Sequence, residues 1–127
     1  MTIEAAVRAF RAESGQPTPT RLDLDGPQRD AALALLDSAM DDFHAALFGA
    51  DEVQAVTEYG HLLFVVMNLA VALGIPGYEA FLAVLDSNRT KLIDPKFSDD
   101  GRLMKGEHFK PAEPTVRRML VERGDVK

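Results

Sequence analysis

Two carboxylates and a histidine in this sequence have the types and spacing of a metal site. Glu58 and His61 stand three residues apart, so on a helix both side chains lie on one face. Asp42 belongs to the preceding helical segment and lies beside its apolar seam. Carboxylates alone suit Mg²⁺, and an added imidazole shifts the preference toward Mn²⁺, Zn²⁺ or Ni²⁺. The alternative is structural: Glu58 and His61 hydrogen-bond each other, and Asn68 on the same face meets its own copy in a second subunit.

The Glu58 and His61 side chains depend on a helix expected over residues 51–73, which Asp51 caps and Gly74 ends. Within residues 62–73 only Asn68 is polar, so this helix is apolar on almost every side and is normally buried. The apolar run is shorter than the about 20 residues that cross a bilayer. We therefore expect a core helix and no membrane partner.

An earlier helix is expected from Asp25-Gly26-Pro27 to Gly49. Its apolar residues recur at steps of three and four, which predicts a core-facing seam of Leu33, Leu36, Met40, Phe43 and Leu47. The short turn after Gly49 makes the two long helices antiparallel neighbours. Asp42 would then face Glu58 and His61 across the pair.

The rest of the chain also favours helices and shows no convincing strand pattern. We expect a first helix over residues 2–14, a fourth that begins near 77 and ends around 86–91, and a short last helix over 114–123, with a loop over 93–111. The predicted fold is an all-α helical bundle built on an antiparallel helix pair. We expect one domain, 1–127, with a core of about 27–92 and the loop and last helix over 93–127. The helix expected over residues 51–73 is apolar all round, and its neighbours in one chain cannot cover it completely. Homo-oligomerisation should therefore complete the bundle.

Composition limits the partners and the compartment. A formal net charge of −6 argues against nucleic-acid polymers and anionic membranes, which need a basic surface. Cysteine is absent, so no disulfide framework or thiolate metal site exists. The N-terminal region carries Glu4 and no continuous apolar run, so no signal peptide is visible and we expect a cytoplasmic protein.

Three segments together resemble a known family. They are the apolar helix that ends in Leu73-Gly74-Ile75, the run Ser87-Asn88-Arg89-Thr90-Lys91, and the turn Gly101-Arg102-Leu103-Met104-Lys105 before Phe109-Lys110-Pro111. Over residues 31–111 the chain resembles the MazG-like, all-α nucleoside triphosphate pyrophosphohydrolases, which include the dimeric dUTPases and phosphoribosyl-ATP pyrophosphohydrolase. The resemblance implies a homodimer or homotetramer that binds a nucleotide.

The resemblance also implies roles for three polar residues. Asn88, Lys91 and Lys105 match positions near the nucleotide-binding end, with the two lysines as point charges for phosphate and Asn88 as a polar contact. The alternative is again structural, because lysine complements the dipole at a helix C-terminus and asparagine ends a helix.

The metal motifs depart from the family pattern. Where the family has Glu-Glu-x-x-Glu, this chain has Ser38-Ala39-Met40-Asp41-Asp42, and where the family has Glu-x-x-Asp, it has Glu58-Tyr59-Gly60-His61. One hypothesis is a pyrophosphohydrolase that converts a nucleoside triphosphate to monophosphate and pyrophosphate. It would hold Mn²⁺ or Mg²⁺ on Asp42, Glu58 and His61, with Glu58 catalytic. The second is an inactive homologue without a cofactor that binds nucleotides or a protein, and the third is a purely structural bundle.

Overall fold

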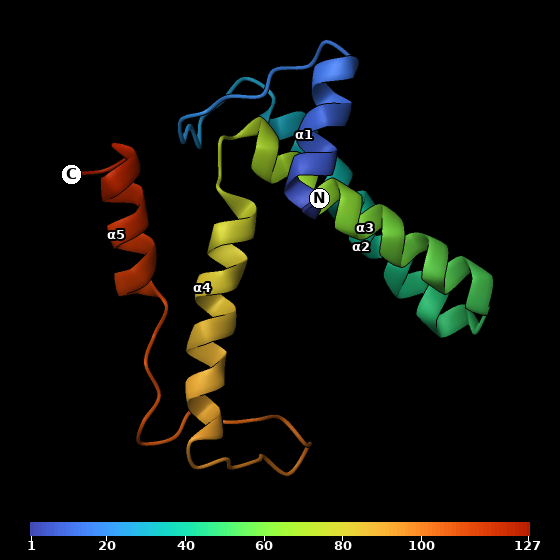
Figure 1. Ribbon diagram of the computed structural model, residues 1–127. Coiled ribbons are helices and arrows are strands. Elements are labelled where there is room, and N and C mark those ends of the chain that lie inside the picture. The colour runs from blue at the N-terminus through green and yellow to red at the C-terminus, as the bar shows by residue number, and fades with distance from the viewer. The chain divides into compact units, whose positions relative to one another are not determined.

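The computed structural model describes residues 1–127 and consists of helices without strands. The helices are α1 (Ile3–Glu13), α2 (Arg29–Gly49), α3 (Glu52–Ala72), α4 (Gly77–Arg89), the 3₁₀ helix η1 (Thr90–Leu92) and α5 (Glu113–Arg123), labelled in Figure 1. The predicted all-α class is confirmed. The chain divides into two compact units, Met1–Gly77 and Tyr78–Lys127, which are described separately below.

The predicted ends of α1 and α3 are confirmed. Thr2 Oγ1 accepts a hydrogen bond from the Ala5 backbone N–H at 3.0 Å and caps α1. Asp51 Oδ1 does the same for the N–H of Gln54, also at 3.0 Å, at the start of α3. Gly74 follows α3 with a φ of +70°. Polar caps and a left-handed glycine therefore set these boundaries, as the sequence indicated.

The boundaries of α2 differ from the prediction in two details. Pro27 lies in the turn before the helix, which begins at Arg29 after an N-cap, Gln28, that makes no capping hydrogen bond. At the other end Gly49 is the last helical residue, and the left-handed conformation falls on Ala50, with a φ of 56°. The tight connection to α3 requires this conformation one residue later than the glycine, at a position where alanine must adopt it.

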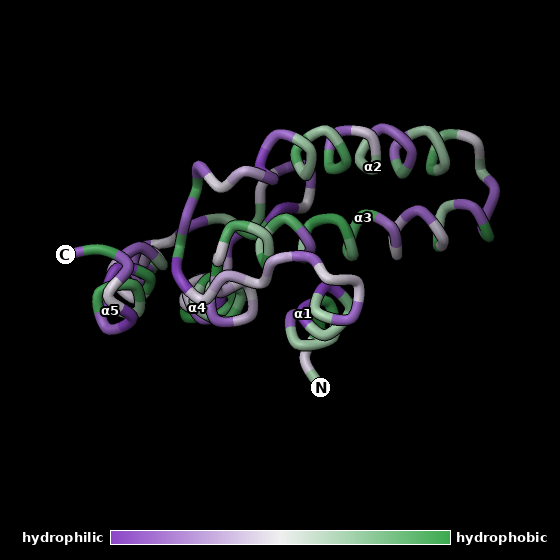
Figure 2. Tube along the Cα trace, turned by 90° about the horizontal axis from the view of Figure 1, so that it is seen from above, coloured by the Kyte–Doolittle hydropathy of each residue, from purple (hydrophilic) through white to green (hydrophobic).

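Helices α2 and α3 lie side by side in both views, and α1 contacts α3 (Figures 1 and 2). The buried residues of α2 are Ala32, Ala39 and Ala46, spaced seven residues apart. The predicted seam is not buried in one chain at three of its five positions: Leu33, Met40 and Leu47 are 40%, 53% and 55% exposed, whereas Leu36 and Phe43 are half-buried. Neighbouring rows of α2 are both apolar, and the alanine row permits the closest approach to α3.

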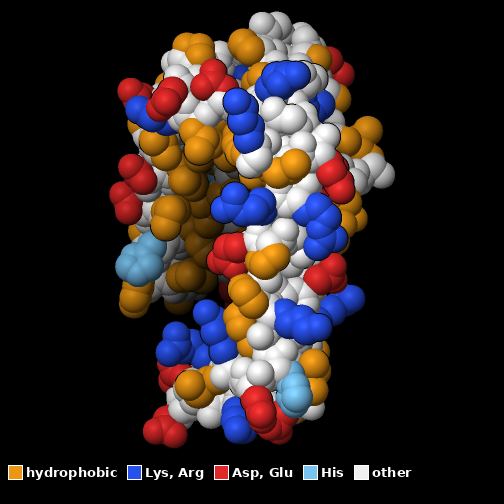
Figure 3. Space-filling view, turned by 90° about the vertical axis from the view of Figure 1, so that its left-hand side faces the viewer, with side chains coloured by type: hydrophobic (Ala, Val, Ile, Leu, Met, Phe, Trp, Pro, Cys, Tyr) orange, Lys and Arg blue, Asp and Glu red, His pale blue; other side chains and the backbone are white.

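Apart from Glu58, the buried residues of α3 all lie in its last turn and at its C-cap. Residues 70–73 are buried, with Val71 completely so, whereas Phe64 and Val66 remain 39% and 45% exposed. This second half of α3 is the most hydrophobic part of the pair in Figure 2. Hydrophobic side chains also stand exposed among acidic and basic ones on the face shown in Figure 3.

The length of α3 corrects one expectation. With 21 residues, the whole helix Glu52–Ala72 is long and apolar enough to cross a membrane, although its apolar run taken alone is shorter. Length and composition do not separate such a span from the core helix of a globular protein.

In the unit Tyr78–Lys127, hydrogen bonds tie the end of α4 to the loop before α5. Ser87 Oγ donates to the carbonyl of Lys110 at 2.6 Å, and the Lys110 N–H donates to Thr90 Oγ1 at 2.9 Å. Within the loop, a single antiparallel bridge joins Phe97 and Leu103 around a turn at Gly101. The loop is therefore closed at both its base and its tip.

Replacing Gly74 by alanine should destabilise the fold. The added Cβ would clash with the carbonyl oxygen of Arg21, and the positive φ is unfavourable for alanine. We expect a loss of about 2–4 kcal/mol of unfolding free energy in urea denaturation. The control is Gly60→Ala in the middle of α3, where a Cβ meets open space. This substitution should raise the free energy of unfolding by about 0.5–1 kcal/mol, because alanine favours a helix more than glycine does. Equal effects of the two substitutions would contradict the described path of residues 21–22 beside α3.

The hydrogen bonds of the turn around Gly101 lead to a second prediction, which concerns the pKa of Asp100. The Ser98 hydroxyl and then the Arg102 side chain donate to its carboxylate, which lowers the pKa of Asp100 below its ordinary value. The stabilisation from these contacts should be fully present at a pH above the ordinary carboxyl pKa. It should be lost as the pH falls through the lower pKa that Asp100 has in the folded chain. Ser98→Ala should raise the Asp100 pKa, measured by NMR of the carboxyl carbon, while Ser87→Ala should leave it unchanged. An Asp100 pKa that is the same with and without Ser98 would contradict the turn geometry.

Candidate functional site

A cavity of about 320 Å³ opens where α2 ends and α3 begins. From α2 it is lined by Asp42, Ala45, Ala46 and Gly49, and from the start of α3 by Asp51, Gln54 and Glu58. The residues that leave this space are small, two alanines and a glycine. Two of the three predicted metal ligands, Asp42 and Glu58, therefore line the same cavity. We call it the carboxylate pocket.

Glu58 is the buried carboxylate of this pocket, with 9% of its surface exposed. Its Oε1 accepts a hydrogen bond from Gln54 Nε2, and its Oε2 lies 3.2 Å from Nδ1 of the exposed His61. The Glu58–His61 contact expected in the structural alternative is thus present. Gln54 and His61 hold the carboxylate in one orientation, as a buried charged group requires.

The three predicted ligands do not surround a common point. No group of three or more His, Cys, Asp or Glu side chains in residues 1–127 is close enough to hold a metal ion. His61 contacts Glu58 but does not line the pocket, and Asp51, the third carboxylate on its wall, caps α3. What remains is a pair of oxygen donors, Asp42 and Glu58. Such a pair fits the way Mg²⁺ binds in many nucleotide enzymes, through one or two carboxylates, water and substrate phosphates.

The two predicted phosphate-binding lysines lie together in the unit Tyr78–Lys127. Lys91 Nζ is 5.8 Å and Lys105 Nζ is 5.0 Å from the centre of the Phe109 ring. The ring attracts both ammonium groups through cation–π contacts. Neither lysine forms an ion pair with a carboxylate. Both positive charges are therefore available to an anion, and we call Lys91, Lys105 and Phe109 the lysine pair and its ring.

Asn88 is exposed near the end of α4, one turn before Lys91, and makes no side-chain hydrogen bond. Phe109 was not predicted as a site residue, although it belongs to the Phe109-Lys110-Pro111 segment that carried the resemblance. The signal that would have found it is an aromatic residue close in sequence to several lysines. Its role here is to bring together two cations that are 14 positions apart in the chain.

Arg11 is the second functional candidate that the sequence pattern did not reveal. It is 1% exposed on α1 and donates to the side-chain oxygens of Gln16, Gln28 and Asn68. Asn68, expected to meet its own copy, instead accepts a hydrogen bond from Arg11 Nη1 at 2.9 Å. The available signal was spacing, because Arg11 follows the buried Val7 by four residues and shares its face.

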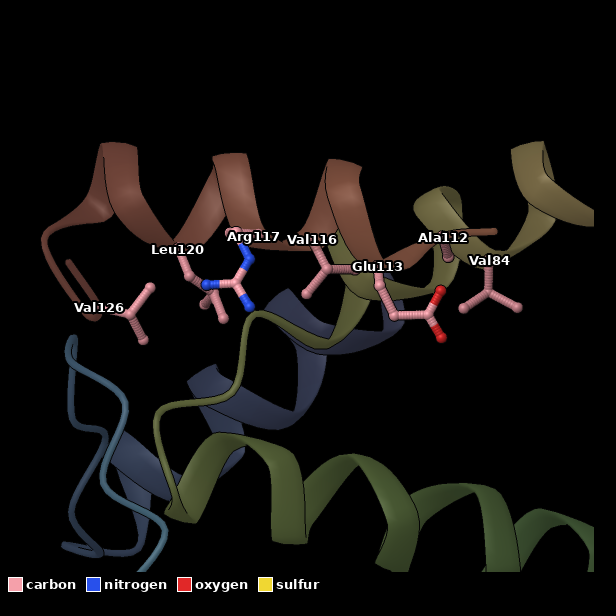
Figure 4. A pocket seen from close by; sticks show the side chains of 7 residues that line it. All are labelled: Val84, Ala112, Glu113, Val116, Arg117, Leu120 and Val126. Atoms are coloured by element: carbon pink, nitrogen blue, oxygen red, sulfur yellow. The ribbon is translucent and has the colours of Figure 1, made fainter. Parts of the chain in front are cut away.

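A recess of about 370 Å³ lies in the unit Tyr78–Lys127 and is mainly apolar. In Figure 4 the side chains of Glu113, Val116, Arg117 and Leu120 lie on one side of α5, with Val84 and Val126 beside them. It contains no nucleophile, histidine or paired carboxylate. This recess therefore offers no chemistry of its own.

The sequence matches neither a protein-family model nor a curated protein. A functional assignment therefore depends on the carboxylate pocket, the lysine pair and the resemblance of the three segments named above.

Proposed function

We propose that this chain is a MazG-like nucleoside triphosphate pyrophosphohydrolase with an altered metal site, which converts a nucleoside triphosphate to a monophosphate and pyrophosphate. The observation that best supports this proposal is that Asp42 and Glu58, from two different helices, line one cavity. They match the two motif positions of the family at which a carboxylate remains. Taken by itself, the unit Tyr78–Lys127 supports phosphate binding through the lysine pair, whose two positive charges form no ion pair and are suited to phosphate oxygens.

In the proposed reaction a water oxygen bonds to phosphorus as the bridging phosphorus–oxygen bond breaks and pyrophosphate leaves. A bound Mg²⁺ or Mn²⁺ would neutralise the charge on the phosphate oxygens. Asp42 and Glu58 would hold that ion, and Glu58 would take the proton from the water. Gln54 and His61 orient the Glu58 carboxylate and keep its oxygens in place. His61 is therefore a positioning residue in this proposal, although its residue type and spacing suggested a ligand.

Pyrophosphate release tests the proposed activity. With Mn²⁺ and a panel of nucleoside triphosphates, the purified protein should release pyrophosphate, and Glu58→Gln should lower the rate about 100-fold or more. Asp42→Asn should weaken Mn²⁺ binding, seen as a higher Mn²⁺ concentration at half-maximal rate. Asp41→Asn is the matched control: Asp41 is exposed and does not line the pocket, so the rate should not change. A rate that Glu58→Gln leaves intact would refute the assignment.

A second candidate function is a nucleotide-binding module without catalysis. It is favoured by the fact that both oxygens of Glu58 already have partners on α3 itself. In that case calorimetry should detect nucleotide binding without turnover, unaffected by Glu58→Gln. Lys91→Gln and Lys105→Gln should each weaken binding about 5- to 10-fold through loss of a charge-assisted contact. Binding that tolerates both lysine substitutions contradicts this second function.

We also propose that two copies of the chain associate through the apolar surface that one copy leaves uncovered. This surface comprises Leu33, Met40 and Leu47, which lie seven residues apart on one face of α2 and are each at least 40% exposed. Large exposed apolar patches mark interaction surfaces. The resemblance to a family of dimers and tetramers supports the same conclusion.

Light scattering after size-exclusion chromatography tests this association. The wild-type chain should elute with the mass of two or four copies, and Met40→Lys should shift it to one, because a charge would be buried in the contact. Ser38→Lys is the control, since Ser38 is exposed on the opposite side of α2. A wild-type mass of a single chain, or an unchanged assembly in Met40→Lys, would rule out this surface.

A further inference from the structure

Arg11 places a positive charge inside the unit Met1–Gly77. Its side chain is among the least exposed of the molecule, at 1%, and burial lowers the pKa of its guanidinium from the ordinary value. None of the ion pairs of the chain includes Arg11. A buried cation without a counter-ion is unfavourable, because arginine in such positions is normally paired with a carboxylate or phosphate.

Neutral oxygens take the place of that counter-ion. Nε donates to the Pro17 carbonyl and Nη1 to Gln16 Oε1 and Asn68 Oδ1, each at 2.9 Å. Nη2 donates to Gln28 Oε1 at 2.6 Å. Four of the five guanidinium N–H groups are used, and the second N–H of Nη2 has no acceptor.

The same contacts turn three amide NH₂ groups away from Arg11. Gln16, Gln28 and Asn68 each direct their carbonyl oxygen at the guanidinium, and none of their NH₂ groups donates a hydrogen bond within the chain. The free donors thus include one guanidinium N–H and the amide groups around it. Every one of them is suited to an oxygen that carries negative charge.

A cavity of about 260 Å³ lies beside the four residues that carry these donors. Arg11 and the three amides line it together with Ala31, Ala32 and Leu35 of α2. It shares no lining residue with the carboxylate pocket, so it is a separate site. One wall is rich in hydrogen-bond donors and the other is apolar, as in sites that orient a small ligand by its polar end.

We infer that this cavity binds a small oxyanion, a carboxylate or a phosphate, whose charge neutralises Arg11. The anion accepts from the free N–H of Arg11 and from the amide groups of Gln28 and Asn68, and any short aliphatic part lies against Leu35. This site lies beyond the proposed pyrophosphohydrolase chemistry, because it needs neither Asp42 nor Glu58. Its failure would leave that proposal unaffected.

Thermal unfolding followed by circular dichroism tests the inference with two probes, inorganic phosphate and butyrate, at constant ionic strength. The Tm of the wild-type chain should rise saturably with at least one probe, by about 5 °C near saturation. A response to phosphate alone assigns a phosphate-type ligand, and a response to butyrate alone assigns a carboxylate with an aliphatic tail. In an NMR titration, the Arg11 Nε–H resonance should shift with the same midpoint.

Asn68→Asp is the decisive variant because it places a carboxylate against Arg11 with almost no change of shape. It should raise the Tm in the absence of any probe and abolish the response to both probes. Thr57→Asp is the control: it adds one carboxylate at an exposed position of α3 and should leave the response intact. The inference is overturned if the wild-type chain shows no saturable response to either probe, or if Asn68→Asp responds as strongly as the wild-type chain.

Discussion

Close packing of α2 on α3 is the constraint on which the other features of the unit Met1–Gly77 depend. Alanines at three positions seven residues apart, Ala32, Ala39 and Ala46, are the buried residues of α2. Small side chains let two helix axes approach closely. At the far end of the pair, Ala46 and its neighbour Ala45 line the carboxylate pocket. At the near end Ala32 lines the Arg11 cavity.

The alanine contact also explains why so much apolar surface stays uncovered. When the smallest residues of α2 face α3, its larger ones are displaced to the flanks, where Leu33, Met40 and Leu47 are exposed. The second half of α3 is also strongly hydrophobic (Figure 2). A soluble monomer rarely keeps a surface of this kind. The packing within one chain and the proposed association of two chains would thus both follow from the same choice of residues.

The sequence was sufficient for the helices and their caps but not for which side of each helix is buried. Helix ends depend on local hydrogen bonds, and Thr2, Asp51 and Gly74 act within a few residues of their own positions. The orientation of α2 about its axis depends on its partner. Two adjacent rows of α2 are apolar, and periodicity alone cannot rank them.

The candidate site, like the fold, could be predicted from the sequence only in part. Spacing along one helix correctly joined Glu58 and His61, and helix pairing explains why Asp42 lines the same pocket as Glu58. Contacts that bridge distant segments were not accessible. Phe109 gathers Lys91 and Lys105 from two segments, and Arg11 reaches Asn68 across 57 positions of the chain. Neither contact leaves a periodic trace in the sequence.

The connection between α1 and α2 has no regular secondary structure, yet both of its ends are fastened. Arg8 and Arg11 donate to backbone carbonyls of residues 17–19, and the Asp23 N–H donates to the Leu73 carbonyl at 2.8 Å. Surface connections usually accept inserted residues with little penalty, because nothing along them is specifically bound. In this connection the hydrogen bonds at both ends fix the number of residues between them. Adding or deleting a residue within it would break the hydrogen bonds at one of its ends. Changes in loop length are therefore better accommodated elsewhere in the chain.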